Sequence, residues 1–324
     1  MTIKEKVLAF LEENRGKHIS GAKMAELLEV SRNAVWKSIK QLEKEGYQID
    51  AVTNKGYCLS ANSQQMSEIA IRGSLRESFQ EAPIYFYNLI DSTNKKAKEL
   101  AIEGAVHGTL VIANEQSAGK GRYGRSFESP KDSGIYMSLI LKPEELSYAH
   151  PTLITSYAAV VVANVIQEMT GKELQIKWVN DLFYLNKKVC GILTEAVTDF
   201  ESGTMEWIVL GIGLNLLSVD FSDDIKEKAG GIFEGQQMEI NRNQLVGELY
   251  EALLTSHQKM TETQMMTVYK EKSLVLNKEV ILQQGQKEFR AIIKDIDNQG
   301  QLVIERTPGQ LETFNSGEIR ILIN

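Results

Sequence analysis

The stretch that decides the fold of the first domain runs from Ser20 to Leu59, SGAKMAELLEVSRNAVWKSIKQLEKEGYQIDAVTNKGYCL. Ser20 and Ser31 are residues preferred at helix N-caps, and apolar residues follow each of them at helical spacing. Gly46 is typical of a residue that ends a helix. The pattern predicts two consecutive helices joined by a short turn, with these core residues: Met24, Leu27 and Leu28 in the first helix, and Val35, Ile39 and Leu42 in the second.

The residues on both sides of these two helices extend the pattern. Residues 1–13 contain one more apolar helical face, formed by Val7, Leu8, Phe10 and Leu11. Residues 47–52 and 57–59 are typical of two short strands, and the turn residues 53–56 between them favour a tight hairpin. The expected order is helix, helix, turn, helix and hairpin, and it resembles the winged helix-turn-helix of many bacterial regulators.

A polar stripe follows the helix after Ser31. Asn33, Lys37, Lys40 and Lys44 recur at i, i+4, i+7 and i+11, so they share one face if Val35, Ile39 and Leu42 are buried. A helix with this face could enter the major groove, with its lysines on phosphates and Arg32 or Asn33 on base edges. The alternative is an ordinary solvated face. The expected DNA-binding residues are Arg32, Asn33, Trp36, Lys37, Lys40 and Lys55.

The charge of the chain is unevenly distributed. The net charge is -7 over 324 residues, yet residues 1–62 hold 10 basic against 8 acidic residues, and the remainder holds 26 against 35. With 43% hydrophobic and 24% charged residues, the composition argues against a mostly disordered, collagenous or disulfide-based chain. The small excess of positive charge in residues 1–62 is compatible with nucleic-acid binding by this segment.

Neither membrane insertion nor export is expected. The longest apolar stretch, Tyr157 to Ile166, is far shorter than the roughly 20 residues that span a bilayer. The first 13 residues lack the apolar core of a signal peptide, so we expect a cytoplasmic protein. Cys58 and Cys190 have no metal-ligand or redox spacing and are expected to be reduced thiols, with no metal site.

The length predicts more than one domain, with a boundary in the polar stretch Asn62 to Glu68. Beyond it, mixed strands and helices indicate an α/β or α+β layer structure. The expected strands are 84–89, 109–113, 135–141, 176–179, 189–196 and 207–214, and the expected helices are 92–102 and 151–169. Four further strands at 279–283, 288–296, 302–306 and 317–323 predict a small β-barrel at the end of the chain. The domains are thus predicted at 1–62, 63–270 and 271–324.

The stretch Gln116 to Pro130, QSAGKGRYGRSFESP, concentrates chemistry in the central domain. Its glycines at 119, 121 and 124 allow the backbone to approach a ligand closely, and Lys120, Arg122 and Arg125 supply charge for phosphate oxygens. It is neither a Walker A loop nor a Rossmann fingerprint. The pattern favours a nucleotide, although a flexible surface turn can have the same composition.

Three other clusters accompany this loop. Asp91 to Asn94 follows a strand and opens a helix, so its side chains could cap the helix or bind a polar ligand. Lys177 to Asp181, followed by Asn186 to Leu193, is typical of a strand, a hairpin turn and a second strand, in which Lys188 could point at an anion or simply flank the turn. Gly211 to Asn215 ends an apolar strand with small residues on which a ring could lie flat, or it could be a bulged strand end.

In this order and spacing, the four clusters, with the N-terminal winged helix and the small β domain, closely resemble the bacterial bifunctional biotin operon repressors and biotin-protein ligases. The resemblance covers nearly the whole chain and implies an α+β multidomain fold: a winged helix-turn-helix, a central α/β catalytic domain similar to class II aminoacyl-tRNA synthetases, and an SH3-like C-terminal β-barrel. It implies activation of biotin with ATP and Mg²⁺, followed by transfer to a lysine of a biotin carboxyl carrier domain of a carboxylase.

The resemblance also implies roles for individual residues. Ser92, Thr93 and Gln116 would hydrogen-bond the biotin ureido ring, bordered by Gly119 and Gly191. Lys188 and Arg122 would be catalytic, because cations offset the repulsion when a carboxylate attacks an α-phosphorus. The full biotin-binding set is Ser92, Thr93, Asn94, Gln116, Gly119, Lys120, Arg122, Lys188, Gly191 and Gly211, and the nucleotide-binding set is Arg122, Arg125, Phe127, Asn180, Lys188 and Asn215.

Two features are less well matched to the family. Lys120 stands where the family loop usually has arginine, which keeps the charge but removes the bidentate fork. The loop Ala229 to Ile232 lies where the family closes over the adenine, but its sequence is not diagnostic. No Mg²⁺ ligand can be named from the sequence.

The resemblance further implies a homodimer that binds a two-part operator when biotinyl-5'-AMP occupies the site, so the reaction intermediate is also the corepressor. Two alternatives stay open: a regulator that senses its ligand without transferring it, and a lipoate-type protein ligase. The Gly-rich loop together with Lys188 favours chemistry over sensing. The Ser-Thr-Asn segment with the winged helix favours biotin over lipoate.

Overall fold

The computed structural model describes residues 1–147, 151–198, 204–219, 221–235 and 238–321. Its contacts separate the chain into two compact units, residues 1–86 with 238–251 and residues 87–237 with 252–324. The helices are α1 Ile3–Glu13, α2 Gly21–Leu27, α3 Arg32–Lys44, α4 Glu68–Ser74, α5 Thr93–Ile102, α6 Pro151–Thr170, α7 Arg242–Thr255 and α8 Glu262–Glu271.

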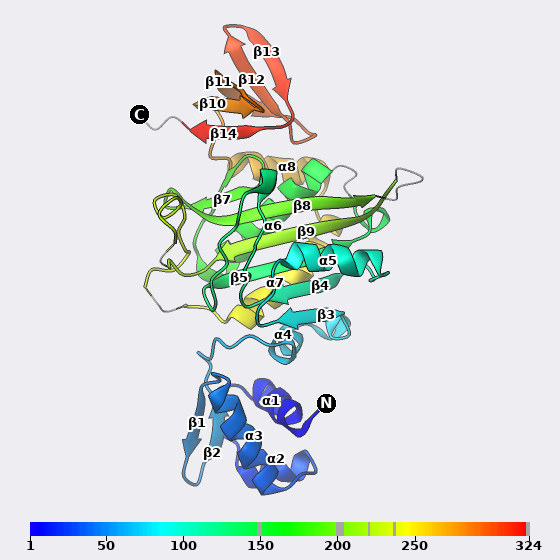
Figure 1. Cartoon of the computed structure of the whole chain (residues 1–324), viewed down its shortest axis with the longest axis vertical. Coiled ribbons are helices and arrows are strands. Elements are labelled where there is room, and N and C mark those ends of the chain that lie inside the picture. The colour runs from blue at the N-terminus through cyan, green and yellow to red at the C-terminus, as the bar shows by residue number, and fades with distance from the viewer. Residues whose placement is uncertain (148–150, 199–203, 220, 236–237, 322–324) are drawn as a thin grey trace. The chain divides into compact units, whose positions relative to one another are not determined.

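The strands form three sheets (Figure 1). They are β1 Ile49–Val52, β2 Gly56–Leu59, β3 Ile84–Tyr87, β4 Thr109–Ala113, β5 Gly134–Leu141, β6 Gln175–Lys177, β7 Asp181–Tyr184, β8 Lys187–Thr198, β9 Met205–Asn215, β10 Glu279–Gln284, β11 Lys287–Ile296, β12 Leu302–Thr307, β13 Gln310–Phe314 and β14 Glu318–Ile321.

The N-terminal elements confirm the predicted helix-turn-helix and hairpin. The Ser20 side chain accepts a hydrogen bond from the Lys23 amide, and the Ser31 side chain accepts one from the Ala34 amide, as N-caps do. Gly46 has φ +96°, the left-handed conformation in which glycine ends a helix. The buried core is formed by Val7, Leu8, Leu11, Met24, Ala25, Val35, Ile39, Leu42, Tyr47 and Leu59.

One predicted core residue is wrong. Leu27 is 56% exposed, and Ala25 is buried in its place. Helix α2 has only seven residues, and Met24, Ala25 and the following Leu28 define its inward arc. Leu27 lies outside that arc. The apolar spacing of this short helix therefore predicted a wider buried face than the structure shows.

The β1–β2 hairpin is pinned to the turn that precedes α2. Ile19 and Tyr57 exchange backbone hydrogen bonds of 2.9 Å in both directions. Gly56 has φ +98°, and a Cβ on it would lie 2.1 Å from the Ile19 carbonyl oxygen. Glycine is therefore required at the end of this wing, because any side chain would force the hairpin away from the helices.

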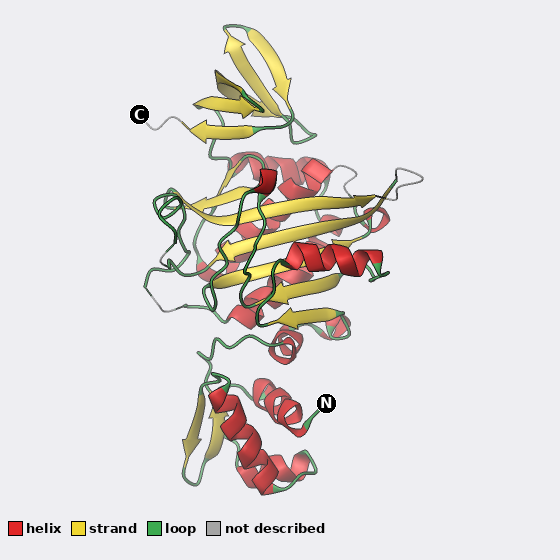
Figure 2. Ribbon diagram, in the orientation of Figure 1, coloured by secondary structure: helices red, strands yellow, loops and turns green. Residues whose placement is uncertain are grey.

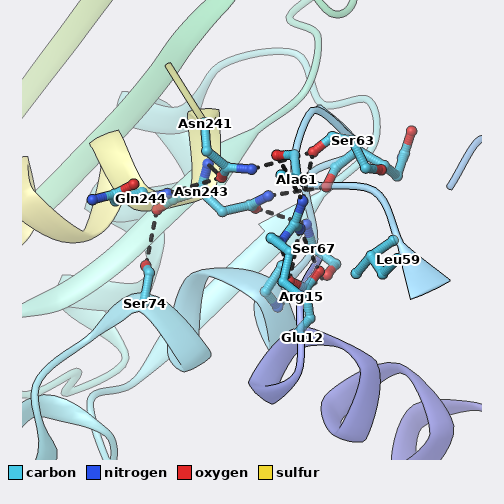
Figure 3. A network of polar contacts seen from close by, with 12 residues as sticks. Glu12, Arg15, Leu59, Ala61, Ser63, Ser67, Ser74, Asn241, Asn243 and Gln244 are labelled. Atoms are coloured by element: carbon cyan, nitrogen blue, oxygen red, sulfur yellow. Dashed lines mark hydrogen bonds and ion pairs between the residues drawn. The ribbon is translucent and has the colours of Figure 1, made fainter. Parts of the chain in front are cut away.

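The polar stretch after the wing, where a domain boundary was predicted, is held by hydrogen bonds on both sides (Figure 3). Arg15 at the end of α1 donates through Nη1 to the carbonyls of Ser60 (3.0 Å) and Ser63 (3.1 Å), and it forms an ion pair with Glu12. From the other side, Asn241 Nδ2 donates to the Ser63 carbonyl at 3.2 Å. Helix α4 starts directly afterwards, capped by the Ser67 hydroxyl.

A seven-stranded sheet with the order β3-β4-β5-β9-β8-β7-β6, antiparallel from β4 to β6, forms the middle of the central domain. Helix α5 packs on one face, where Ala97, Leu100 and Ala101 meet Val111, Ile140 and Val209. Helix α6 covers the opposite face (Figure 2), and Thr155 on α6 lies 2.7 Å from Thr194 of β8 between their hydroxyl oxygens. This arrangement confirms a mixed α+β class.

Helix α6 is apolar and long enough to cross a membrane by length and composition alone, but 72% of its most apolar window is buried inside the protein. This burial is explained by its contact with the central sheet. The helix is therefore a core element of the structure.

Several elements escaped prediction. The segment read as a strand and a turn before Lys187 contains a separate short strand, β7, and residues 310–314 form β13. Helices α7 and α8 were also not predicted, whereas α4 begins at the end of the polar stretch Asn62 to Glu68, which was interpreted as a linker or the start of a new helix. Strand β7 has only four residues, too few for a clear period. Helix α7, in contrast, carries a helical spacing of buried apolar residues from Leu245 to Leu254, a signal that could have predicted it. The end of the predicted strand 317–323 lies partly outside the described residues.

The C-terminal strands form a five-stranded antiparallel sheet with the order β13-β12-β11-β10-β14. Its residues Phe314 and Gly300 reach the central domain at Trp178. The indole Nε1 of Trp178 donates to the Gly300 carbonyl at 2.8 Å, and its ring lies 5.9 Å from that of Phe314 between centroids. This sheet is therefore anchored next to the Lys177–Asp181 segment.

Candidate functional site

A buried polar cluster lies under the N-terminus of α5. Gln116 Oε1 accepts hydrogen bonds from the backbone amide (2.8 Å) and the hydroxyl (3.1 Å) of Thr93. The Gln116 Nε2 group donates to the Ser129 hydroxyl at 2.8 Å. One carboxamide thus ties together the start of α5 and both ends of the segment 116–129.

A second set of contacts continues this cluster across the sheet. Ser138 Oγ lies 2.8 Å from Thr93 Oγ1 and 2.6 Å from Asn94 Oδ1. Asn94 Nδ2 donates to Glu195 at 2.9 Å, and Lys98 pairs with the same carboxylate at 2.8 Å. Burial opposes ionisation of Glu195, but the hydrogen bonds from Lys98 and Asn94 outweigh it and hold its pKa below the usual value. Glu195 therefore stays ionised and orients Asn94.

The segment 116–129 folds as an irregular hairpin, the basic hairpin. Its two limbs are joined by the hydrogen bonds Gln116 N to Ser129 O (3.1 Å), Phe127 N to Gly119 O (2.9 Å) and Gly121 N to Arg125 O (2.7 Å). The first limb is also bound to the chain before α5, because the amides of 117 and 118 donate to the carbonyls of 90 and 91 at 2.9 Å. The base of the hairpin is therefore fixed, and its tip projects beyond it.

The ring of Phe127 lies on a floor of glycines. A Cβ on Gly213 would come within 2.5 Å of the Phe127 ring, and a Cβ on Gly191 would lie 3.3 Å from it. Gly191 and Gly213 are cross-strand partners on β8 and β9. The sequence predicted small residues on which a ring could lie flat, and the ring found there belongs to the protein itself. At Gly211 the close neighbour is Asn94, with its Oδ1 2.0 Å from an added Cβ.

Two cations flank this floor. Lys188 forms an ion pair with Asp181, with 2.7 Å between Nζ and Oδ1, and its Nζ lies 3.4 Å from the position of a Cβ on Gly191. Arg122 at the hairpin tip donates from Nη1 to Asn180 Oδ1 at 3.0 Å. Its guanidinium also stacks on the Tyr123 ring, 5.0 Å from the centroid. Both cations therefore face one region, where they can compensate negative charge on a ligand.

The segment Lys177–Asp181 is held by hydrogen bonds to α8 and β8. Tyr269 on α8 donates from its hydroxyl to the Val179 carbonyl at 3.1 Å, and burial raises the pKa of this hydroxyl, so it remains a donor. Asn180 Nδ2 donates to the Ile192 carbonyl at 3.0 Å. Burial lowers the pKa of Lys177, with Asp181 acting against this shift. These contacts place Asn180 and Asp181 rigidly beside Lys188.

The remaining predicted residues border the same region. Arg125 forms an ion pair with Glu318 of the C-terminal sheet at 2.5 Å. Lys120 bridges to Ser126 across the hairpin, and its charge contributes to the low pKa of Glu195. Asn215 accepts a backbone hydrogen bond from Ile232 at 3.2 Å, which connects β9 to the predicted adenine loop. Gly230 N also donates to the Lys188 carbonyl at 3.0 Å.

The structure thus brings the predicted ligand-binding residues to one face of the sheet, the face that carries α5. Ser92 caps α5 through a 3.4 Å hydrogen bond from the Lys95 amide, so the capping interpretation holds for its hydroxyl in this structure. The predicted DNA-binding residues lie far along the chain from these, on the exposed side of α3 and at the wing turn: Arg32, Asn33, Trp36, Lys37, Lys40 and Lys55. The ligand and DNA roles of these residues stay predictions.

Sequence reasoning missed the residues that orient the predicted ones. Ser138 and Glu195 lie inside strands that are otherwise rich in apolar residues, and a polar side chain in such a strand is the signal that could have found them. Ser129 and Asp181 stood within quoted motifs but received no role. Among the residues that the structure describes, no group of three His, Cys, Asp or Glu side chains could hold a metal ion.

Three family models match the chain. The biotin/lipoate A/B protein ligase family matches residues 86–215, an HTH domain matches residues 4–58, and the biotin protein ligase C terminal domain matches residues 275–321. The order of these matches agrees with the order of elements described above.

Individual proteins show the same likeness. The bifunctional ligase/repressor BirA of Bacillus subtilis is 37% identical over 243 residues, 74% of each chain, and that of Escherichia coli is 27% identical over 323 residues, 99% of this chain and 97% of its own. The solved biotin protein ligase of Aquifex aeolicus, in complex with biotin and ATP, matches with a TM-score of 0.62 and 23% identity, covering 75% of this chain and 99% of its own. The latter likeness concerns the fold.

The glycine floor leads to a testable prediction about the basic hairpin. Replacing Gly213 with alanine places a methyl group 2.5 Å from the Phe127 ring, so we expect Phe127 and the attached hairpin to be displaced. Limited proteolysis should cut the segment 119–127 of this variant faster, by about ten-fold. Gly191→Ala, with a 3.3 Å approach, is the matched milder change and should have a smaller effect.

The double variant Gly213→Ala with Phe127→Ala separates this explanation from general destabilisation. Removing the ring removes the clash, so thermal stability lost in Gly213→Ala should return in the double variant. If the cleavage rate of Gly213→Ala equals that of the parent chain, the ring does not depend on the glycine floor.

Proposed function

Because this chain belongs to the family of bifunctional biotin ligase/repressors, we propose that it joins biotin to a lysine of a biotin carboxyl carrier domain and represses biotin genes. The observation that supports this most directly is the meeting of three parts on one face of the sheet: the Gln116 cluster, the glycine floor under Phe127, and the cations Arg122 and Lys188.

The proposed reaction has two steps. A biotin carboxylate oxygen attacks the α-phosphorus of ATP, and pyrophosphate leaves. The ε-amine of the acceptor lysine then attacks the acyl carbon of biotinyl-5'-AMP, and AMP leaves. The first step brings together a carboxylate and a polyphosphate, so positive groups at the reacting centre are needed to lower its barrier.

The polar cluster supports a biotin head group at the start of α5. A ureido ring offers one carbonyl acceptor and two N–H donors, and Thr93, Gln116 and Ser129 present hydroxyl and amide groups of both kinds. The contacts of Asn94 with Ser138 and Glu195 hold this wall in place. The proposed biotin site is completed by Ser92, Gly119, Lys120, Gly191 and Gly211. A ligand that left one of the buried polar groups without a hydrogen bond would bind less tightly, so the match of donors and acceptors gives specificity.

The cations support the phosphoryl chemistry. Lys188 is about one-third exposed and already paired with Asp181, so its ammonium is held at a defined point. Arg122 is held by Asn180 and Tyr123, which pre-organises its planar guanidinium for a carboxylate or phosphate. Arg125, Phe127, Asn180 and Asn215 would border the nucleotide, with the loop Ala229 to Ile232 over the adenine.

Mg²⁺ is proposed as the accompanying cation. Magnesium commonly binds through one or two carboxylates together with substrate phosphates and water. Asp181 is a carboxylate that could contribute one ligand, and the ion would offset phosphate charge there.

The basic hairpin would protect the intermediate. A mixed anhydride of a carboxylic and a phosphoric acid hydrolyses readily, so water must be kept away until the acceptor lysine arrives. The fixed base at Gln116 and the glycines of the tip allow the hairpin to open and close without losing its register on the sheet.

We further propose that the chain is organised as a winged helix-turn-helix (1–62), a catalytic domain similar to class II aminoacyl-tRNA synthetases (63–270) and an SH3-like barrel (271–324). The chain would be cytoplasmic and would form a homodimer on operator DNA when biotinyl-5'-AMP is bound. The exposed lysines of α3 and the wing support the DNA part.

One assay tests the enzyme assignment. The full chain is incubated with ATP, Mg²⁺, an isolated carrier domain and either labelled biotin or labelled lipoate. We expect biotin on the carrier lysine and no lipoate. Label from lipoate alone would establish the lipoate-type ligase, and binding of biotin without transfer would establish a pure ligand-sensing regulator.

Replacement of Lys188 by alanine should lower the rate of adenylate formation by at least 100-fold and change the Kd for biotin by less than about five-fold, because its charge acts mainly on the α-phosphoryl group. Pyrophosphate release and equilibrium dialysis measure the two quantities. Lys187→Ala is the control, since that lysine points to the Lys226 carbonyl and should keep the parent rate. Equal rates in Lys188→Ala and the parent chain would show that Lys188 is not catalytic.

DNA binding is tested by charge reversal on α3. The double variant Lys37→Glu and Lys40→Glu should lose at least 100-fold in affinity for operator DNA, because two phosphate contacts become repulsive. A gel shift with biotin and ATP present measures this. The control is Lys4→Glu, since Lys4 lies on α1 and pairs with Glu45. Unchanged binding by the double variant would remove α3 from the DNA interface.

A further inference from the structure

An exposed aromatic side chain stands on the helix that carries the polar stripe. Trp36 is 49% exposed, whereas the core of the domain is closed by ten buried residues that do not include it. Tryptophan side chains are highly buried on average, so a half-exposed indole leaves a large apolar surface available to a partner. The other half of its surface packs on the domain, which restricts the ring.

Trp36 lines a groove of about 630 Å³ between α3 and the wing. Arg32 and Asn33 lie four and three residues before it, so the three side chains share one face of the first turns of α3. Across the groove are Val52, which is 42% exposed, and Tyr57 of the wing. The groove therefore has a partly apolar lining.

Four basic side chains lie in or beside this groove, and one of them, Lys40, is paired with Glu43. Arg32 lies within it, Lys37 and Lys40 follow on α3, and Lys55 is at the wing turn, all of them exposed. An occupant must then be anionic at its rims and apolar at one recessed point. Duplex DNA fits this description, because phosphates line the major groove and the thymine C5-methyl group is the apolar group displayed on its floor.

We propose that Trp36 contacts the methyl group of one thymine in each half of the operator and thereby selects a T·A pair at that position. This inference rests on the proposed DNA-binding function and deepens it. Residues in the first turns of a recognition helix reach base edges, and Trp36 lies one turn after Arg32. Arg32 and Asn33 supply polar contacts beside it, and the partly packed indole loses little conformational freedom on binding.

The experiment changes single methyl groups on the DNA. Duplexes that the full chain binds are selected from a random 40-base-pair pool in the presence of biotin and ATP. Each thymine of a selected duplex is then replaced in turn by deoxyuridine, which removes only the methyl group. We expect one position in each half-site at which this change weakens binding by about four-fold, the effect of burying one methyl group.

The same scan is repeated with Trp36→Ala and with Trp36→Gln, which keeps a side chain of some length without the apolar ring. In both variants the deoxyuridine effect at that position should disappear, while the dependence of Kd on salt stays that of the parent chain, because no phosphate contact is lost. Two variants of different size guard against a local folding defect in one of them.

Two results overturn the proposal. If no deoxyuridine substitution weakens binding by the parent chain, or if the effect persists in both variants, Trp36 does not read a thymine, although the domain still binds DNA. If no duplex is selected and Lys37→Glu with Lys40→Glu behaves like the parent chain, the DNA-binding function itself fails. The deoxyuridine scan thus separates an error in this inference from an error in the function on which it rests.

Discussion

The candidate site depends on the carboxamide of Gln116. Its oxygen accepts from Thr93 at the start of α5, and its nitrogen donates to Ser129 at the far end of the basic hairpin. Because the oxygen and nitrogen ends of an amide are not interchangeable, both partners are held in a single arrangement. The hairpin is thereby fixed in register on the sheet at its base, and its tip is held by the contacts of Arg122 with Asn180 and of Arg125 with Glu318. The Gln116 link therefore fixes the position of the basic hairpin, which carries Phe127 and Arg122, relative to the glycine floor on β8 and β9.

The two faces of the central sheet have different roles, because one packs on α6 and the other carries α5 and the candidate site. The strands of this sheet alternate between faces, so residues directed at α6 form an apolar core while residues directed at α5 include Ser138 and Glu195. Glycines at 191 and 213 leave room on the α5 face for the Phe127 ring. The cost of keeping buried polar groups on that face is offset by their mutual hydrogen bonds, which make the face stiff as well as polar.

Support for the site also comes from distant parts of the chain. Trp178 is held by the Gly300 carbonyl, and Val179 is held by Tyr269, so the C-terminal sheet and α8 position the segment that carries Asn180.

At the N-terminal end, Arg15 binds carbonyls of the segment that follows the wing. This segment is therefore a defined part of the fold, which allows the winged domain and the residues after it to be treated as one folded unit.

The sequence alone determined the local features of this protein. N-cap serines at 20 and 31 and the helical spacing of Val35, Ile39 and Leu42 were sufficient for the helix-turn-helix, because capping and periodicity are properties of neighbouring residues. The composition of 116–130 was sufficient to mark this segment as the candidate centre of the site. Only the tertiary structure decided which residues orient that centre: Glu195 and Asn94 meet across about 100 positions of the chain, and Phe127 meets Gly213. Such contacts follow from strand register and helix packing, which no local pattern contains, and for the same reason Leu27 is exposed where its spacing predicted burial.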